Sequence, residues 1–209
     1  MLNLSAGAYG MNSNTHIALC DIQMFAHIPN LIYFAPTSKE EYLQMFKFAI
    51  TQKKHPVGIR VPVKFIETGA EDTTNYSIYN KNKIEIQGKK VAIFAVGSLL
   101  QMAKAVAKKV KEELGFEITV INPRFLTGLD VDLLNELKKN HELVITIEDG
   151  ELMGGYGQNI ASFYGMDKML VKNYGISKAF HTDFVAEELL AENGMSVGKL
   201  FNEIKEFVK

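Results

Sequence analysis

Residues 10–36 read Gly-Met-Asn-Ser-Asn-Thr-His-Ile-Ala-Leu-Cys-Asp-Ile-Gln-Met-Phe-Ala-His-Ile-Pro-Asn-Leu-Ile-Tyr-Phe-Ala-Pro. The first half is small and polar and contains Thr15, His16 and Asp21, whereas the second half passes through Ile-Pro-Asn into the apolar residues 31–34. A short apolar run bounded by Asn and Pro is typical of a buried strand. The stretch therefore predicts a polar loop with titratable side chains beside a sheet.

His16 is the candidate for chemistry in this loop. An unperturbed imidazole has a pKa of about 6.5, so it can give or take a proton near neutral pH. Asn12, Thr15 and Asp21 are close enough in the sequence to orient the ring. Judged from the residues alone, a single histidine without a visible partner more often bonds a backbone carbonyl than it takes part in catalysis.

Composition limits the class of partner. The 209 residues include 23 basic and 24 acidic ones, so the net charge of −1 gives no electrostatic reason to expect nucleic acid or a membrane as a partner. The apolar runs are too short to span a bilayer, and no secretory signal is expected. The single cysteine, Cys20, excludes an internal disulfide and fits a cytoplasmic location. We expect it to be a buried, inert thiol.

The apolar pattern predicts an α/β fold. Ser38 and Glu41 have the spacing of a capping box at the start of a helix that extends to about residue 51, with one apolar face made of Tyr42, Phe46, Ala49 and Ile50. Residues 66–82 are polar and lack a helical period, as in a linker. From residue 90 onward, apolar strands alternate with amphipathic helices, which predicts a mainly parallel sheet covered on both faces.

Two further groups of residues have both structural and functional interpretations. The glycine-rich residues 154–157 follow a predicted strand and open a helix, so their amides could hold an anion, but tight strand-to-helix packing is the favoured interpretation. Glu148 and Asp149 could act as acid and base, although a helix cap or a subunit contact is favoured. The other histidines do not have the spacing of metal ligands; they are His27, His55, His141 and His181.

Several ordered motifs point to one family. One family pattern reads Gly-x-Asp-Gly-x-Thr-His-x-Gly-x-Phe-Asp, followed by Ile-Pro-Asn and Ala-Pro. The residues that match it in register are Gly10, Thr15, His16, Asp21, Ile28, Pro29, Asn30, Ala35 and Pro36. Further matches are Gly58-Ile59-Arg60-Val61-Pro62 to Val-Arg-Tyr-Pro, Arg124-Phe125 to Met-Arg-Phe, and Glu148 with Met153-Gly154-Gly155-Tyr156-Gly157 to Glu-Glu-x-x-x-x-Gly-Gly-x-Gly. With these motifs the chain resembles the 1-deoxy-D-xylulose-5-phosphate synthase family of transketolase-like thiamine diphosphate enzymes.

The resemblance implies the C-terminal half of a pyrimidine-binding domain in residues 1–65, a linker in 66–82 and a transketolase C-terminal domain in 83–209. The implied protein is the C-terminal portion, or a separate C-terminal subunit, of an enzyme that condenses pyruvate with glyceraldehyde 3-phosphate in isoprenoid precursor and thiamine biosynthesis. His16 would be catalytic. The substrate-binding residues would be Asn12, Thr15, Asp21 and Lys64. A transketolase or 2-oxoacid dehydrogenase beta-type subunit and a non-catalytic assembly module remain alternatives.

The sequence also departs from the family pattern. Asn12 replaces an aspartate, Ile17-Ala18 replace x-Gly, and Ser5 and Val63 replace arginines that would grip a substrate phosphate, so Lys64 could supply only a point charge. In the family, the diphosphate and magnesium (Mg2+) site and an activating glutamate lie upstream of these motifs. Thiamine diphosphate and magnesium are therefore expected in the complete enzyme, and this chain alone is expected neither to bind them tightly nor to turn over. The expected partners are a second copy in a homodimer, an N-terminal cofactor-binding half and small-molecule substrates.

Overall fold

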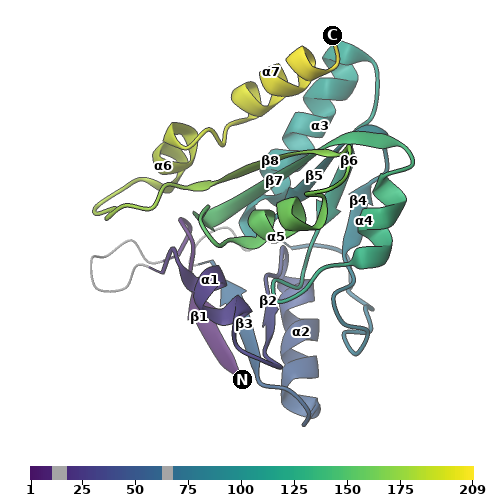
Figure 1. The fold of residues 1–209 in the computed structure, drawn as a ribbon. Coiled ribbons are helices and arrows are strands. Elements are labelled where there is room, and N and C mark those ends of the chain that lie inside the picture. Colours follow the sequence, from purple (N-terminus) through teal and green to yellow (C-terminus); the bar gives the residue numbers. More distant parts are fainter. Residues whose placement is uncertain (11–17, 63–67) are drawn as a thin grey trace.

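A computed structural model describes residues 1–10, 18–62 and 68–209 (Figure 1). The predicted site residues Asn12, Thr15, His16 and Lys64 lie outside this part of the chain.

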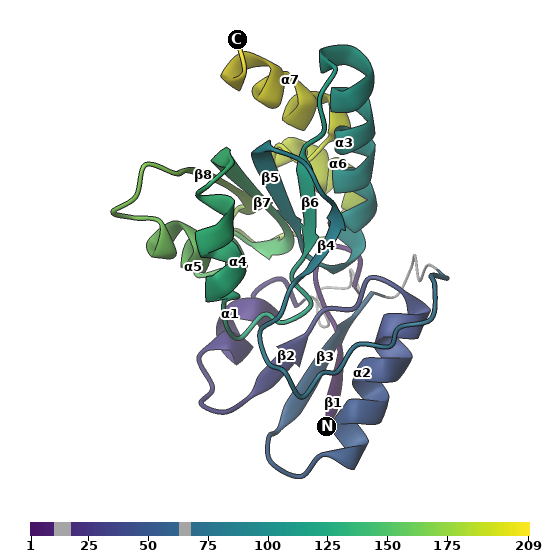
Figure 2. The same ribbon diagram turned by 90° about the vertical axis from the view of Figure 1, so that its right-hand side faces the viewer.

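The first sheet has three parallel strands, β1 (Leu2–Ser5), β2 (Ile32–Phe34) and β3 (Val57–Val61), with β3 between the other two. Helices α1 (Asp21–Ala26) and α2 (Lys39–Thr51) accompany it. They cover opposite faces of this sheet, as Figure 2 shows.

Strand β2 illustrates why both faces are covered. Its three residues are all buried: Ile32 and Phe34 pack with α2, whereas Tyr33 faces the other way and packs in a cluster with Ile22 of α1. Successive side chains of a strand point to opposite faces, so an uninterrupted apolar run needs cover on both.

Helix α2 begins as the sequence predicts. The Ser38 hydroxyl accepts the amide N–H of Glu41 at 3.2 Å, and Glu41, Met45 and Ala49 make its buried stripe. Ile50, which was expected on the buried face, is 59% exposed, because it lies one position beyond Ala49 on the turning helix surface.

The second sheet has the order β4-β6-β5-β7-β8, in which only the edge strand β4 is antiparallel. Its strands are β4 (Lys83–Ile86), β5 (Lys90–Ala95), β6 (Thr119–Asn122), β7 (His141–Glu151) and β8 (Leu170–Ile176). The helices are the short η1 (Gly97–Leu99), α3 (Leu100–Leu114), α4 (Val131–Leu137), α5 (Tyr156–Phe163), α6 (Ala186–Glu192) and α7 (Val197–Phe207). The predicted α/β fold with mainly parallel sheets is confirmed.

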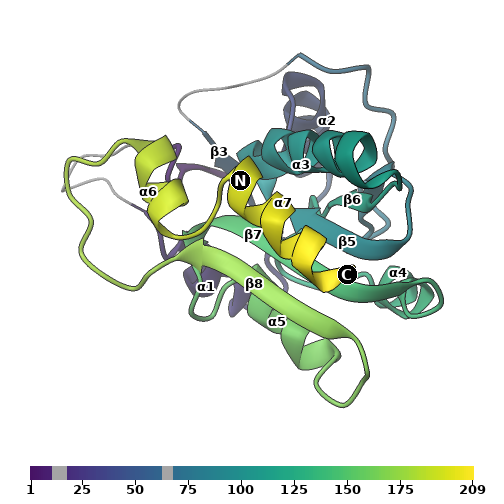
Figure 3. The same cartoon turned by 90° about the horizontal axis from the view of Figure 1, so that it is seen from above.

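Helices cover both faces of the second sheet. Helices α3, α6 and α7 share one core cluster, and α4 and α5 share the other (Figure 2). Figure 3 shows α7 lying beside α3. Strand β5 contributes alternate residues to the two clusters, which explains its continuous apolar sequence. In the described residues, no helix is long and apolar enough to cross a membrane.

The two sheets share their cores. Ala8 and Leu19, which come from the first part of the chain, belong to the cluster built on α3 and β7, and Tyr33 belongs to the cluster built on α4 and α5. Residues 68–82, which connect the sheets, contain no helix or strand, but Tyr76 in this segment is only 2% exposed. The connecting segment therefore adds to the core as well as spanning the two sheets.

Candidate functional site

Three charged side chains from three distant motifs meet between the two sheets. Arg60 in β3 donates from Nε to Asp21 Oδ2 at 2.8 Å and from Nη2 to Asp21 Oδ1 at 3.4 Å, and its Nη1 donates to Asp149 Oδ1. Asp21 is the first residue of α1, and Asp149 lies near the end of β7. All three are at most 5% exposed, so the cluster is out of contact with bulk water.

The surroundings of the cluster favour a charged Arg60 and a protonated Tyr33. The hydroxyl of Tyr33 donates to Asp21 Oδ2 at 2.6 Å, and burial together with Asp21 raises the pKa of Tyr33, so the phenol stays protonated as a donor. Burial disfavours the charge on Arg60, but Asp149 and Asp21 raise its pKa well above the usual value. Burial likewise raises the pKa of Asp149, and Arg60 opposes that effect. Two carboxylates thus share one guanidinium, and removal of the guanidinium would leave buried charge unpaired.

Beside this cluster, Glu148 closes the N-terminus of α5. It is fully buried and accepts the amide N–H groups of Tyr156 at 2.9 Å and Gly157 at 3.0 Å. A Cβ on Gly155 would lie 2.4 Å from Glu148 Oε2, and one on Gly157 would lie 2.1 Å from Thr146 Oγ1. The glycines therefore allow the carboxylate and β7 to approach the helix end.

This geometry decides between the interpretations of the glycine-rich motif. The amides of Tyr156 and Gly157 are satisfied by the chain's own Glu148, in agreement with the cap and packing interpretations. Burial raises the pKa of Glu148 to about 7, because the two amide bonds only partly offset the cost of an ionised group in the interior.

The described residues on either side of positions 11–17 are attached to the end of β7. Gly7 N–H donates to Ala18 O at 2.9 Å, and Ala8 N–H donates to Asp149 O at 2.7 Å. On the other side, Glu151 N–H donates to Leu19 O at 2.7 Å. The predicted residues Asn12, Thr15 and His16 belong to the segment between these anchors, and Asp21, the described member of the predicted set, contacts Arg60 and Tyr33.

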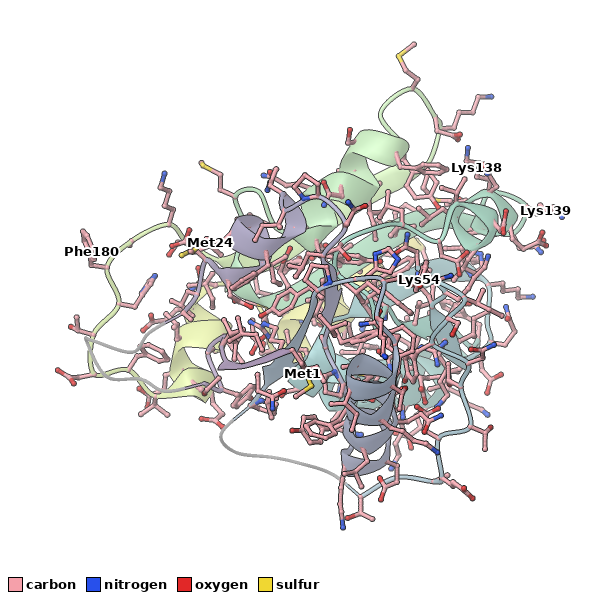
Figure 4. All side chains as sticks on the ribbon, turned by 90° about the horizontal axis from the view of Figure 1, so that it is seen from below. Met1, Met24, Lys54, Lys138, Lys139 and Phe180 are labelled. Atoms are coloured by element: carbon pink, nitrogen blue, oxygen red, sulfur yellow. The ribbon has the colours of Figure 1, made fainter. Side chains whose placement is uncertain are left out.

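A cavity of about 780 Å³ lies beside the hydrogen bond between Glu151 and Leu19. It is lined by Leu19, Cys20, Gln23, Glu151, Met153 and residues 178–182. Figure 4 shows that Phe180 and Met24 lie on the same side of the molecule, and Phe180 is fully exposed. The expectation of a buried Cys20 is wrong: the residue is exposed, because it precedes the buried first turn of α1.

The described residues do not fit a magnesium diphosphate site. Among them, no group of three or more His, Cys, Asp or Glu side chains could hold a metal ion. The buried carboxylates already have partners: Arg60 bonds Asp21 and Asp149, backbone amides bond Glu148, and Thr37 and Asn122 bond Glu41. No cofactor step is therefore assigned to these groups.

Sequence reasoning placed Arg60 in a motif but gave it no role. The composition could have singled it out. Of the 23 basic residues in the chain, only two are arginines, Arg60 and Arg124. Both are buried, at 5% and 6% exposure. Arginine is the better residue for buried pairs because its planar group makes several directed hydrogen bonds, whereas the chain uses lysine for its solvated surface.

Two family models match the chain. Residues 2–66 match the model of the transketolase pyrimidine binding domain, and residues 80–199 match that of the transketolase C-terminal domain. A split-gene transketolase, solved as an inactive beta4 tetramer, superposes with a TM-score of 0.75 at 22% identity over 98% of this chain and 64% of its own. The transketolase of Campylobacter jejuni superposes with a TM-score of 0.71 at 19% identity over 98% of this chain and 30% of its own. The chain belongs to the transketolase family of thiamine diphosphate-dependent enzymes.

Among the curated relatives that match are several 1-deoxy-D-xylulose-5-phosphate synthases. That of Lachnoclostridium phytofermentans is 31% identical over 158 residues, or 76% of this chain and 25% of the relative. That of Pseudoalteromonas translucida is 31% identical over 207 residues, or 97% of this chain and 32% of the relative. The match therefore spans between a quarter and a third of the length of these relatives. The resemblance read from the motifs is confirmed.

Proposed function

We propose that this chain is the C-terminal part of a 1-deoxy-D-xylulose-5-phosphate synthase, or a separate subunit equivalent to it, and that the complete enzyme condenses pyruvate with glyceraldehyde 3-phosphate. The observation that carries the proposal is the junction of Asp21, Arg60 and Asp149. Asp21 and Arg60 belong to two motifs shared with that family, and Asp149 directly follows Glu148 of a third, in the place of the second glutamate of the family pattern. Relatives of that name at 31% identity support the choice within the transketolase family.

In this proposal, His16 exchanges a proton with the substrate. Glyceraldehyde 3-phosphate has a carbonyl oxygen that becomes a hydroxyl, and an imidazole has a suitable pKa for that proton transfer. Asn12, Thr15 and Asp21 shape the surroundings of His16, and Lys64 attracts the substrate phosphate. Thiamine diphosphate and magnesium are bound by an N-terminal half, in a cytoplasmic homodimer.

Calorimetric titration of thiamine diphosphate with magnesium tests whether cofactor binding requires the N-terminal half in addition to this chain. The ligands are titrated into this chain alone and into a mixture with a candidate N-terminal half from the same source. Binding only in the mixture is expected, followed by product formation from pyruvate and glyceraldehyde 3-phosphate. Absence of binding in a mixture whose two halves are folded and associated would contradict the proposal.

His16→Ala then tests the residue assignment in the complete assembly. The expected result is a loss of turnover of about 100-fold or more with little change in the melting temperature, because general acid–base catalysis contributes this much in typical enzymes. Unchanged steady-state kinetics would remove His16 from the mechanism. The matched control is His27→Ala, since the His27 ring is exposed and, among the residues that the structure describes, bonds the Gln23 carbonyl at the end of its own helix, at 2.7 Å.

The second candidate is a subunit of a split transketolase. It is favoured by the superposition on a split-gene transketolase over 98% of this chain. Product analysis separates the two, since a transketolase transfers the two-carbon unit from a ketose phosphate without decarboxylating pyruvate. A third possibility, a non-catalytic assembly module, is favoured by Ser5 and Val63 in the places of arginines, and it predicts no product with either donor.

A further inference from the structure

Strand β1 forms one edge of the first sheet (Figure 1). It pairs in parallel with β3, and in the part of the chain that the structure describes no strand pairs with its outer side. The opposite edge of this sheet is closed, because Tyr33 and Ala35 make backbone hydrogen bonds of 2.8 and 2.9 Å with residues 124–126. Backbone N–H and C=O groups of a strand point alternately to its two sides, so about half of those in β1 point away from β3.

The edges of the second sheet have features that hinder strand pairing, whereas the edge at β1 does not. Strand β4 contains Lys83 and Glu85 and pairs in an irregular register, and β8 contains Lys172. Charged side chains, prolines and bulges on an edge strand discourage another strand from pairing with it. Strand β1 reads Leu-Asn-Leu-Ser and pairs in an unbroken register with four of the five residues of β3. The outer side of β1 is therefore suited to accept a further strand.

The ion cluster fixes the position of this edge. Leu4 is in register with Arg60, and the chain turns after β1 at Gly7, which has φ +80°. A Cβ at Gly7 would overlap Arg60 and Asp149, so only glycine lets the backbone lie against the ion pair in this conformation. The edge of β1 is therefore already in place before a partner binds, which lowers the entropic cost of binding.

The apolar face of β1 is covered at one end only. Leu2 and Leu4 lie on the same face of the strand, and Leu4 packs against the core cluster that contains Ile22 of α1. Leu2 is 50% exposed, and Met1 before it is 53% exposed. The described helices therefore leave the start of β1 without cover, although both faces of a parallel sheet are normally covered.

We propose that the outer side of β1 is the docking surface for a parallel strand, and that the N-terminal half of the enzyme supplies this strand together with a helix that covers Leu2 and Met1. Parallel strands are joined by crossover connections, usually helices, which pack on a face of the sheet. The match covers 32% of the Pseudoalteromonas translucida relative, so the remaining length is large enough to supply both elements. The inference rests on the proposed function in naming the N-terminal half as the partner.

A second copy of this chain fits the same surface less well. Two β1 strands related by a twofold axis would pair antiparallel, over four residues each. A ladder of that length alone buries far less than the about 1,200 Å² of a stable interface. It would also bring no helix to cover Leu2.

Hydrogen exchange followed by mass spectrometry tests the contact. Peptides that cover β1 are compared in the chain alone and in the mixture with the candidate N-terminal half used for calorimetry. In the mixture, the β1 amides that point away from β3 are expected to exchange at least about tenfold more slowly, because they become hydrogen-bonded. Peptides from the edge strand β8 are expected to exchange equally in both samples.

A matched pair of variants tests the surface by affinity. Leu2→Lys is expected to raise the dissociation constant of the two halves at least about tenfold, because burial of a leucine is lost and a charge is placed on the edge. The control is Leu170→Lys, because Leu170 lies in the edge strand β8 and is 56% exposed. The control is expected to leave the dissociation constant unchanged. Both variants are expected to melt like the unmodified chain in circular dichroism, since both leucines are about half exposed.

The outcomes separate this inference from the proposed function. Unchanged β1 exchange in a mixture that associates, or equal dissociation constants for the two variants, would overturn the inference and leave the proposed function intact. Folded halves that do not associate would overturn both. Slow β1 exchange in the chain alone that depends on its concentration would assign the edge to a second copy and overturn the inference. If Leu2→Lys does not fold, the exchange of the unmodified chain decides.

Discussion

The two arginines of the chain are equally buried but lie in different electrostatic surroundings. Arg60 faces the carboxylates of Asp21 and Asp149. Arg124 faces only neutral acceptors: its Nη1 donates to Thr74 Oγ1 at 2.7 Å, its Nη2 donates to a backbone carbonyl at 3.1 Å, and its Nε has no partner in the part of the chain that the structure describes.

The difference in electrostatic surroundings reflects which parts of the chain each arginine connects. Arg60 joins the first sheet to β7, and its charge is needed to balance two buried acids. Arg124 lies over the ring of Tyr76 at 5.7 Å and holds the connecting segment 68–82 through Thr74 and Lys81. A side chain of one type thus acts as a counter-ion at one junction and as a hydrogen-bond donor at the other.

The largest expected effect is that of Arg60→Met. It leaves two buried carboxylates without a cation, which typically costs about 3–5 kcal/mol of unfolding free energy. Urea denaturation followed by circular dichroism measures the loss. The triple variant with Asp21→Asn and Asp149→Asn is the control, since it removes the acids as well and should recover part of the stability; no recovery would contradict the counter-ion role.

The next effect concerns Glu148, which is buried next to the cluster and bonds backbone amides rather than a cation in the part of the chain that the structure describes. Its pKa in the folded protein is raised to about 7. A carboxyl whose folded pKa exceeds its unfolded value of about 4.3 stabilises the fold while protonated, and that contribution disappears as the pH rises through the folded pKa, by at most about 4 kcal/mol.

Glu148→Gln isolates this contribution. The stability of the protein minus that of the variant should fall between about pH 4 and pH 8 in urea denaturation. A difference that does not depend on pH would show that Glu148 has no raised pKa.

Arg124→Met should cost less than Arg60→Met. It removes two hydrogen bonds to neutral acceptors and leaves no buried charge behind, so a loss of about 1–3 kcal/mol is expected. The same urea denaturation measures it, and hydrogen exchange should locate the change in residues 68–82. A larger loss of unfolding free energy in Arg124→Met than in Arg60→Met would contradict the distinction between a counter-ion role for Arg60 and a hydrogen-bonding role for Arg124.

The smallest effect is expected for Glu41→Gln. Glu41 accepts the Thr37 amide at 2.9 Å and the Asn122 side chain at 3.0 Å, so it links α2 to the second sheet through neutral donors. The amide keeps the shape and one acceptor, and the expected loss of unfolding free energy is about 1 kcal/mol. A loss above that of Arg124→Met would indicate that the charge of Glu41 matters.

Local patterns predicted the parts of the fold that depend on burial alone. The apolar run of β5 and the apolar stripe of α3 could be predicted because the spacing of apolar residues along the sequence indicates which of them are buried. The capping box was only half correct: Ser38 caps Glu41, but the Glu41 side chain bonds Thr37 and Asn122 instead of the backbone of Ser38. A contact from the second sheet overrides the local pattern.

The candidate site was less readable because its contacts are long-range. Arg60 is 39 residues from Asp21 and 89 from Asp149, and no periodicity connects such positions. Asp21 and Arg60 were part of the motifs that indicated the family, and Asp149 lies next to the matched Glu148, but the motifs did not show that the three side chains are in contact. The burial of Tyr76 could not be predicted for a similar reason. Its polar neighbours in the sequence suggested a linker, whereas its ring packs against that of Phe34, with the ring centroids 5.2 Å apart.

The contact of Gly7 with the ion pair constrains how this sequence can vary. A side chain at Gly7 would overlap both Arg60 and Asp149, and loss of either charged group alone would leave its partner unbalanced in the interior. Single substitutions at these positions are therefore costly, whereas simultaneous replacement by apolar residues of similar volume is tolerated far better. Gly7, Asp21, Arg60 and Asp149 are expected to be inherited as a set, retained together or exchanged together.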